Sequence, residues 1–157
     1  MDHKPIKQQG AYYLDDFIPG QKFISGEKRV TQEEVITFAK EFDPQSFHVD
    51  PEAAKKSVFG GIVASGWHTA SMSMRLILDT CPIAEGRIGL GGDITWPAPT
   101  KPGDIIHVEV EVMEVRPSTS KPDRGIVTLR STTKNHRGET VQILTARTLM
   151  MKRPEPI

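Results

Sequence analysis

The stretch IVASGWHTASMSMRLILDT, from Ile62 to Thr80, decides the fold class of this chain. Its apolar positions keep helical spacing at Val63, Trp67, Ala70, Met74 and Ile77. Two further apolar residues, Leu76 and Leu78, fill other faces of this helix, so little of its circumference is polar, and such a helix is typically buried. We therefore expect a long central helix that other elements cover.

The sequence changes from helical to strand character after this helix. Between Ile106 and Val112 every second residue is apolar, which is the period of a half-buried strand. Residues 125–134 and 139–152 flank the turn-forming residues 135–138 and predict a hairpin, and Lys101-Pro102-Gly103-Asp104 predicts another turn. These patterns indicate an antiparallel meander. We therefore expect an α+β fold in which a curved sheet covers the helix.

Two shorter helices are expected before the central one. Thr31-Gln32-Glu33-Glu34 has the form of a capping box, and the apolar stripe that follows ends at Phe42, before Pro44 disfavours helical geometry. Asp50-Pro51 is a second start signal, although residues 52–57 leave room for only two turns. Phe59-Gly60-Gly61 predicts a flexible joint before the central helix.

Length and composition limit the protein class. The 157 residues predict one domain spanning 1–157 with short flexible termini. Twenty Lys and Arg balance twenty Asp and Glu, so no net positive field attracts nucleic acid or an anionic membrane. Cys81 is the only cysteine, and the start Met1-Asp2-His3-Lys4-Pro5 lacks the apolar segment of a signal peptide. No run of eighteen apolar residues is present, so we expect a cytoplasmic protein without membrane association.

The segment from Phe42 to Asp50, FDPQSFHVD, places the carboxylate of Asp43 five residues from the imidazole of His48. Taken singly, Asp43-Pro44 can open a turn, Asp50 can cap a helix, and a histidine between apolar residues is commonly a packed one. As a pair, an acid and an imidazole can transfer protons to and from one shared water, as addition of water across a double bond requires. We therefore treat Asp43 and His48 as candidate catalytic residues.

Gly66 is the candidate oxyanion donor. It lies where the long helix starts, and the free amides and dipole of a helix start favour negative charge. Its backbone N–H could therefore point at a thioester carbonyl. The alternative is that a small residue at this position only permits tight packing at the helix entry.

Three runs, residues 42–54, 59–66 and 96–104, together with 135–139, resemble the MaoC-like acyl dehydratases and R-specific enoyl-CoA hydratases. The resemblance covers about Tyr13 to Lys152 and implies a hot-dog fold. The family's hydratase signature, Asp-x-Asn-Pro-apolar-His, keeps its acid and imidazole here. Within and beyond this signature three residues depart from the pattern: Gln45 replaces Asn, Ser46 replaces Pro, and Met74 stands where some hydratases place a serine against the substrate carbonyl.

The resemblance implies a lyase that adds or removes water across the 2,3 double bond of an enoyl thioester. Asp43 and His48 would activate the water and deliver a proton to the α-carbon, and which of the two acts as acid and which as base is left open. Gly66 would polarise the thioester carbonyl. The substrate would be an acyl-CoA or an acyl-carrier-protein thioester, with coenzyme A entering only as part of the substrate. The resemblance also implies a homodimer or higher homo-oligomer, and no metal or other cofactor.

Several other residues could bind a ligand, and each of them also has a purely structural interpretation. Trp67 could equally be a packing residue, and His68 a packed helical histidine. A metal site built from His48, Asp50 and His68 lacks a closed ligand set. The basic loop 116–124 could bind coenzyme A phosphates or be a solvated loop. We expect the substrate to contact Phe47, Val63, Ser65, Trp67 and His68.

Two other functions remain compatible with these residues. A hot-dog thioesterase would direct water at the carbonyl instead of the β-carbon, and hydrolysis would release a free thiol. A non-catalytic acyl-thioester-binding protein would keep the pocket and lose turnover. Hydration assays that follow both the enoyl group and the thiol separate these functions.

Overall fold

The computed structural model describes residues 12–157, so the expectations for residues 1–5 and for a flexible amino terminus lie outside the described part. Four α-helices, a short 3₁₀ helix and six strands make up the described chain. In chain order they are η1 Leu14–Asp16, β1 Lys22–Ile24, β2 Lys28–Arg29, α1 Gln32–Phe42, α2 Ser46–Val49, α3 Pro51–Lys55, α4 Gly66–Thr80, β3 Ile88–Thr95, β4 Ile105–Pro117, β5 Arg124–Lys134 and β6 Thr140–Met151.

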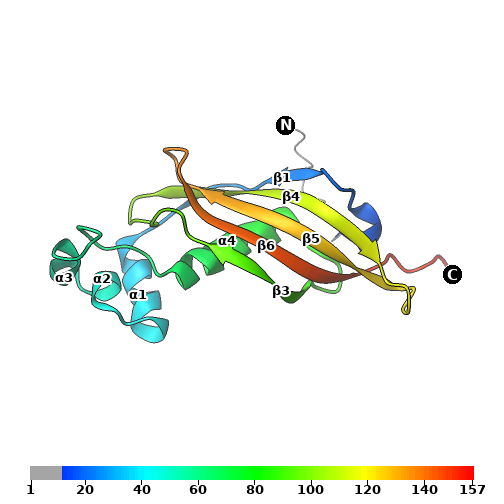
Figure 1. The fold of residues 1–157 in the computed structure, drawn as a ribbon, viewed down its shortest axis with the longest axis horizontal. Coiled ribbons are helices and arrows are strands. Elements are labelled where there is room, and N and C mark those ends of the chain that lie inside the picture. The colour runs from blue at the N-terminus through cyan, green and yellow to red at the C-terminus, as the bar shows by residue number, and fades with distance from the viewer. Residues whose placement is uncertain (1–11) are drawn as a thin grey trace.

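The strands form one antiparallel sheet in the order β1-β4-β5-β6-β3, with β2 paired to β4 beside this path. Helix α4 lies along one face of the sheet, and α1, α2 and α3 gather beyond one end of it (Figure 1). The predicted α+β layout, a sheet packed on one central helix, is therefore confirmed. The expected meander holds only for β4, β5 and β6, because β3 crosses to the far edge and pairs with β6.

The predicted capping signals form the two expected short helices. The Thr31 side chain accepts a hydrogen bond from the Glu34 amide at 3.3 Å, and α1 ends at Phe42 as expected. The Asp50 carboxylate accepts from the amides of Glu52 and Ala53 and caps α3. Helix α2 was not predicted, because a single turn is too short to carry a helical period.

Helix α4 begins at Gly66, four residues later than the start of its apolar pattern. Ser65 caps it by accepting a hydrogen bond from the Trp67 amide at 3.3 Å. The face carrying Met72, Leu76 and Ile77 is buried, whereas of the predicted stripe only Val63 and Ile77 are buried. The expectation of burial on most sides is wrong for the single chain, because Trp67 is 61% exposed and Leu78 40% exposed.

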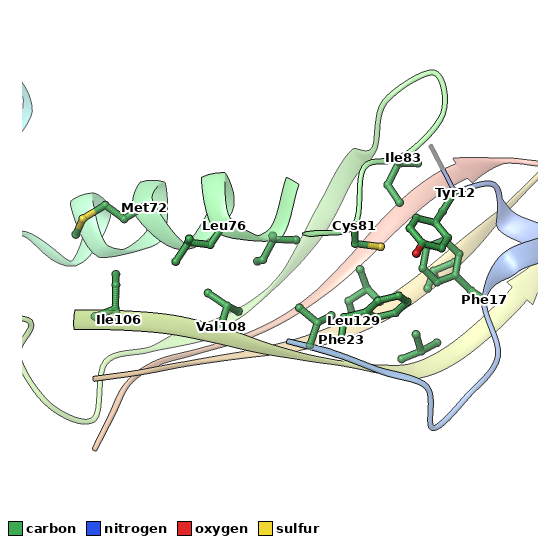
Figure 2. Packing of buried hydrophobic residues seen from close by; sticks show 14 of the residues in the cluster. Tyr12, Phe17, Phe23, Met72, Leu76, Cys81, Ile83, Ile106, Val108 and Leu129 are labelled. Carbon is green, nitrogen blue, oxygen red and sulfur yellow. The ribbon is translucent and has the colours of Figure 1, made fainter. Parts of the chain in front are cut away.

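The main core lies between α4 and the sheet. Strand β4 alternates buried and partly exposed residues from Ile105 to Val112, which confirms the predicted two-residue period. Met72 and Leu76 of α4 lie over Ile106 and Val108 of β4 (Figure 2). Within residues 12–157, no helix combines the length and the apolar character that crossing a bilayer requires.

Candidate active site

Three polar side chains from separate elements meet at the amino-terminal end of α4. Asp43 is the C-cap residue that follows α1, His48 belongs to α2, and Ser65 caps α4. His48 Nε2 lies 3.3 Å from Asp43 Oδ2, and Ser65 Oγ donates a hydrogen bond to the same oxygen at 2.7 Å. The fold therefore brings together the acid and the imidazole that the sequence singled out.

The His48 ring is oriented by a contact on its other nitrogen. Nδ1 lies 2.6 Å from the carbonyl oxygen of Val63. Because a carbonyl oxygen can only accept, this contact places a hydrogen on Nδ1. In the neutral ring the lone pair is then on Nε2, the atom that faces Asp43. The ring is therefore held in the tautomer that presents a base beside the carboxylate.

Hydrogen bonds keep the Asp43 carboxylate ionised. Burial raises its pKa, but donation from Ser65 and from Gln45, together with the nearby His48, outweighs burial and lowers the pKa below 3.8. Gln45 Nε2 donates to Oδ1 at 2.6 Å, so both carboxylate oxygens have a donor. The Asp43 side chain remains 19% exposed and is therefore accessible to a small molecule such as water.

A cavity of about 390 Å³ opens beside His48, which lines it, whereas Asp43 lies behind His48 and is not part of the lining. Its lining residues come from the segments 47–64 and 96–100 and from the first turn of α4. Its volume lies within the ~300–1,000 Å³ typical of small-molecule sites. Its lining consists of Phe47, His48, Phe59, Val63, Ala64, Gly66, Thr69, Trp96, Pro97, Ala98, Pro99 and Thr100.

Gly66 lies at this cavity as the first residue of α4. An amide in the first turn has no acceptor within its own helix and is aligned with the positive end of the helix dipole. A β-carbon at position 66 would lie 2.7–2.9 Å from three atoms of the Trp96 indole. Close packing, the alternative role that the sequence left open for this glycine, is therefore present together with an amide at the cavity.

Comparisons with known proteins bear on this geometry. The family model described as "MaoC like domain" matches residues 16–135. The chain belongs to the MaoC-like domain family. Its sheet and central helix are the hot-dog fold of that family, as the sequence resemblance implied.

Comparisons with individual proteins agree with this family match. The crystal structure of the MaoC-like dehydratase from Rhodospirillum rubrum is 49% identical, with a TM-score of 0.89, covering 92% of this chain and all of that one. The (R)-hydratase from A. caviae involved in PHA biosynthesis is 29% identical, with a TM-score of 0.71, covering 88% and 98%. The 3-hydroxybutyryl-CoA dehydratase of Methylorubrum extorquens is 29% identical over 106 residues, 67% of this chain and 66% of that protein.

The MaoC-like fold separates the five expected substrate contacts into two groups. Phe47 and Val63 line the cavity. Ser65 is fully buried and bonded to Asp43, Trp67 points outward beside the cavity, and His68 stacks on Phe38 with ring centroids 4.6 Å apart. These last three residues are not part of the cavity lining.

The structure separates the three residues that were considered as a metal site. His48 faces Asp43, Asp50 caps α3, and His68 packs on Phe38. Within residues 12–157 no group of three or more His, Cys, Asp or Glu side chains is arranged to hold a metal ion. The basic loop 116–124 connects β4 to β5 at the end of the sheet opposite α1 and α2 (Figure 1).

Sequence reasoning gave no role to several cavity residues, among them Thr69, Trp96 and Thr100. Thr69 and Thr100 are both buried and share a hydrogen bond of 3.1 Å, and Trp96 covers Gly66. A signal for two of them was present, because the run from Trp96 to Asp104 carries part of the family resemblance. The pattern could not show that this run folds back onto the start of α4.

Proposed function

We propose that this protein is a hydratase or dehydratase that adds or removes water across the 2,3 double bond of an enoyl thioester, with acyl-CoA as the substrate. The observation that carries the proposal is the pairing of His48 Nε2 with Asp43 Oδ2 at 3.3 Å beside a cavity lined by His48 and Gly66. The family membership and the named relatives support the reaction class.

The dyad carries both proton transfers of this reaction. Because Nε2 and Oδ2 are only 3.3 Å apart, one water beside them can be within hydrogen-bond reach of both groups. It loses a proton to the dyad as its oxygen bonds to the β-carbon, and the dyad returns a proton to the α-carbon. The lowered pKa of Asp43 keeps the carboxylate ionised, so it can accept a hydrogen bond from this water.

Gly66 completes the mechanism at the carbonyl. When water attacks the β-carbon, the electron pair of the double bond moves towards the thioester oxygen and makes it enolate-like. The Gly66 N–H, at the start of α4, stabilises that charge, and one such donor is typically worth about 3 kcal/mol in the transition state. As proposed, the reaction uses no metal and no cofactor apart from the coenzyme A of the substrate.

The test is an assay of the purified protein with crotonyl-CoA that follows enoyl absorbance and free thiol in the same sample. We expect the enoyl absorbance to fall with no release of thiol. Thiol release would identify a thioesterase, and binding without either change would identify an acyl-thioester-binding protein. Either result would contradict the proposal.

Variants assign the activity to the dyad. Asp43→Asn keeps the shape of the side chain and removes its charge, and we expect it to lose at least about 100-fold in kcat. The matched control is Asp50→Asn, seven residues away, where asparagine can still cap α3. Equal loss in both variants would argue against a specific role for Asp43.

We also propose that a second copy of this chain covers β3. This edge strand is paired only on its β6 side, and Ile88 and Leu90 are 55% and 43% exposed. An unpaired apolar edge favours pairing with another chain. Light scattering should show a dimer or larger oligomer, and Leu90→Lys should dissociate it. The control is Met113→Lys at an exposed site of β4, and a monomeric wild-type protein would contradict the proposal.

A further inference from the structure

Trp96 forms the wall of the cavity that lies against the start of α4. Three atoms of its indole, Cδ2, Cε2 and Cζ2, are so close to Gly66 that any β-carbon there would overlap them. Ser65, the preceding residue, bonds to Asp43. Gly66 therefore shares the cavity with the catalytic His48 and lies directly against the indole.

The indole is fixed in this place by two further contacts. Its Nε1 donates a hydrogen bond to Gln142 Oε1 at 3.0 Å, and Gln142 on β6 is fully buried. The ring of Trp67 meets it edge-on, with centroids 5.4 Å apart and planes at 81°. Rotating Trp96 out of the cavity would leave a buried acceptor unpaired, which is unfavourable. Trp96 is 39% exposed, and these two contacts hold the rest of its indole against the cavity.

The floor beside this wall is also closed. The hydroxyl of Thr69, on α4, donates to that of Thr100 at 3.1 Å, and both side chains are 2% exposed. Extending the cavity in this direction would break that hydrogen bond. The cavity therefore cannot lengthen past Thr69 and Thr100 while this hydrogen bond is kept.

We infer that Trp96, positioned by Gln142, is the residue that limits the substrate to short acyl chains. The inference rests on the proposed function and names its substrate class, a short-chain 2-enoyl thioester such as crotonyl-CoA. A longer chain extending past the β-carbon would meet the indole, which the contacts with Gly66 and Gln142 prevent from moving.

Binding measurements test the inference without requiring turnover. Calorimetry should show that the wild-type protein binds butyryl-CoA at least about tenfold more tightly than octanoyl-CoA, because methylenes that do not fit a pocket typically weaken binding by at least this factor. Trp96→Ala should remove most of that difference by tightening octanoyl-CoA. A wild-type protein that binds both equally, or a Trp96→Ala variant that keeps the wild-type ratio, would overturn the inference.

Three further variants make the result specific. Leu78→Ala removes an exposed apolar side chain of α4 that does not line the cavity, and we expect the wild-type ratio. Gln142→Leu removes the acceptor and should shift the ratio in the direction of Trp96→Ala, by less. Trp96→Phe preserves an aromatic wall and replaces Trp96→Ala if that variant fails to fold. Its smaller ring should still improve octanoyl-CoA binding relative to butyryl-CoA.

Kinetics separate this inference from the proposed function. If the wild-type protein hydrates crotonyl-CoA but Trp96→Ala weakens butyryl-CoA and octanoyl-CoA equally, Trp96 lines the coenzyme A side and only the inference fails. If the chain-length ratios behave as expected but no thioester is hydrated, only the proposed function fails. In the supporting case, kcat/KM for 2-octenoyl-CoA relative to crotonyl-CoA rises at least about tenfold in Trp96→Ala.

Discussion

The two ends of α4 show opposite arrangements of side chains. At its amino-terminal end, polar groups from α1 and α2 meet beside an open cavity. Beyond its carboxy-terminal end, the rings of Tyr12, Phe17 and Phe23 pack at centroid distances of 5.7–6.2 Å, next to Cys81 and Ile83 (Figure 2). One helix therefore connects a polar site to a closed apolar core.

This difference indicates a division of roles along the helix. The closed end removes large apolar surfaces from water and so contributes mainly to the free energy of unfolding. The open end leaves ionisable groups beside a cavity, which serves chemistry. Substitutions at the open end should change rate more than stability, and substitutions at the closed end should do the reverse.

His48→Gln should produce the largest effect on rate. Removing the imidazole removes a proton carrier, so we expect kcat for hydration to fall by about 100- to 10,000-fold. Glutamine can still donate to the Val63 carbonyl, so the thermal unfolding midpoint should change little. The measurement is steady-state hydration with thermal unfolding in parallel. A large fall in the midpoint with unchanged kcat would reverse the proposed division of roles.

Phe23→Ala should produce the largest effect on stability. Phe23 is 1% exposed and contacts two other aromatic rings, so its removal should lower the free energy of unfolding by about 3–5 kcal/mol. Denaturant unfolding measures the change, and kcat per folded molecule should stay at the wild-type value. Met113→Ala, at an exposed position, is the control and should change stability by less than about 0.5 kcal/mol.

Ser65→Ala should affect both properties moderately. Its hydroxyl oxygen accepts from the Trp67 amide and caps α4, a contribution of about 1 kcal/mol to stability. The hydroxyl also donates to Asp43, so its loss should raise the Asp43 pKa and move the acid limb of the rate profile to higher pH. A pH–rate profile identical to wild type would show that Ser65 only caps the helix.

The smallest expected effect is a pH-dependent difference in stability between wild type and Asp43→Asn. The Asp43 pKa is lowered in the folded state by its hydrogen bonds, against the opposing effect of burial, so ionisation favours folding. That contribution is complete above the ordinary value of 3.8 and is lost as pH falls through the lower folded-state pKa. The unfolding midpoints of wild type and Asp43→Asn should therefore converge as the pH is lowered from neutral to the acid limit. A constant difference would contradict the lowered pKa.

Local sequence signals predicted much of this fold. Thr31 and Asp50 cap the helices they were expected to start, and the alternation from Ile106 to Val112 identified a strand with one buried face. The glycine-rich β3 gave no comparable signal, because an edge strand exposed on both faces has no reason to alternate. Its position beside β6 depends on a crossover that pattern alone does not reveal.

The candidate site was predictable as a pair of residues but not as an assembly. The interval from Asp43 to His48 is visible in the sequence. The contact of Ser65 with Asp43 and that of Val63 with His48 join residues 22 and 15 positions apart. Trp96 and Gln142 are separated by 46 positions. Such contacts follow from the packing of α2, α4 and β6, which no local period encodes.

The most direct test of the account is a double-mutant cycle on kcat/KM for crotonyl-CoA hydration with Asp43→Asn, His48→Gln and the double variant. Groups that serve one water act as a unit, so removing the second after the first should cost little more. We predict a double variant within about tenfold of the slower single variant. Independent, multiplying losses would contradict the claim that the two side chains act on the same water.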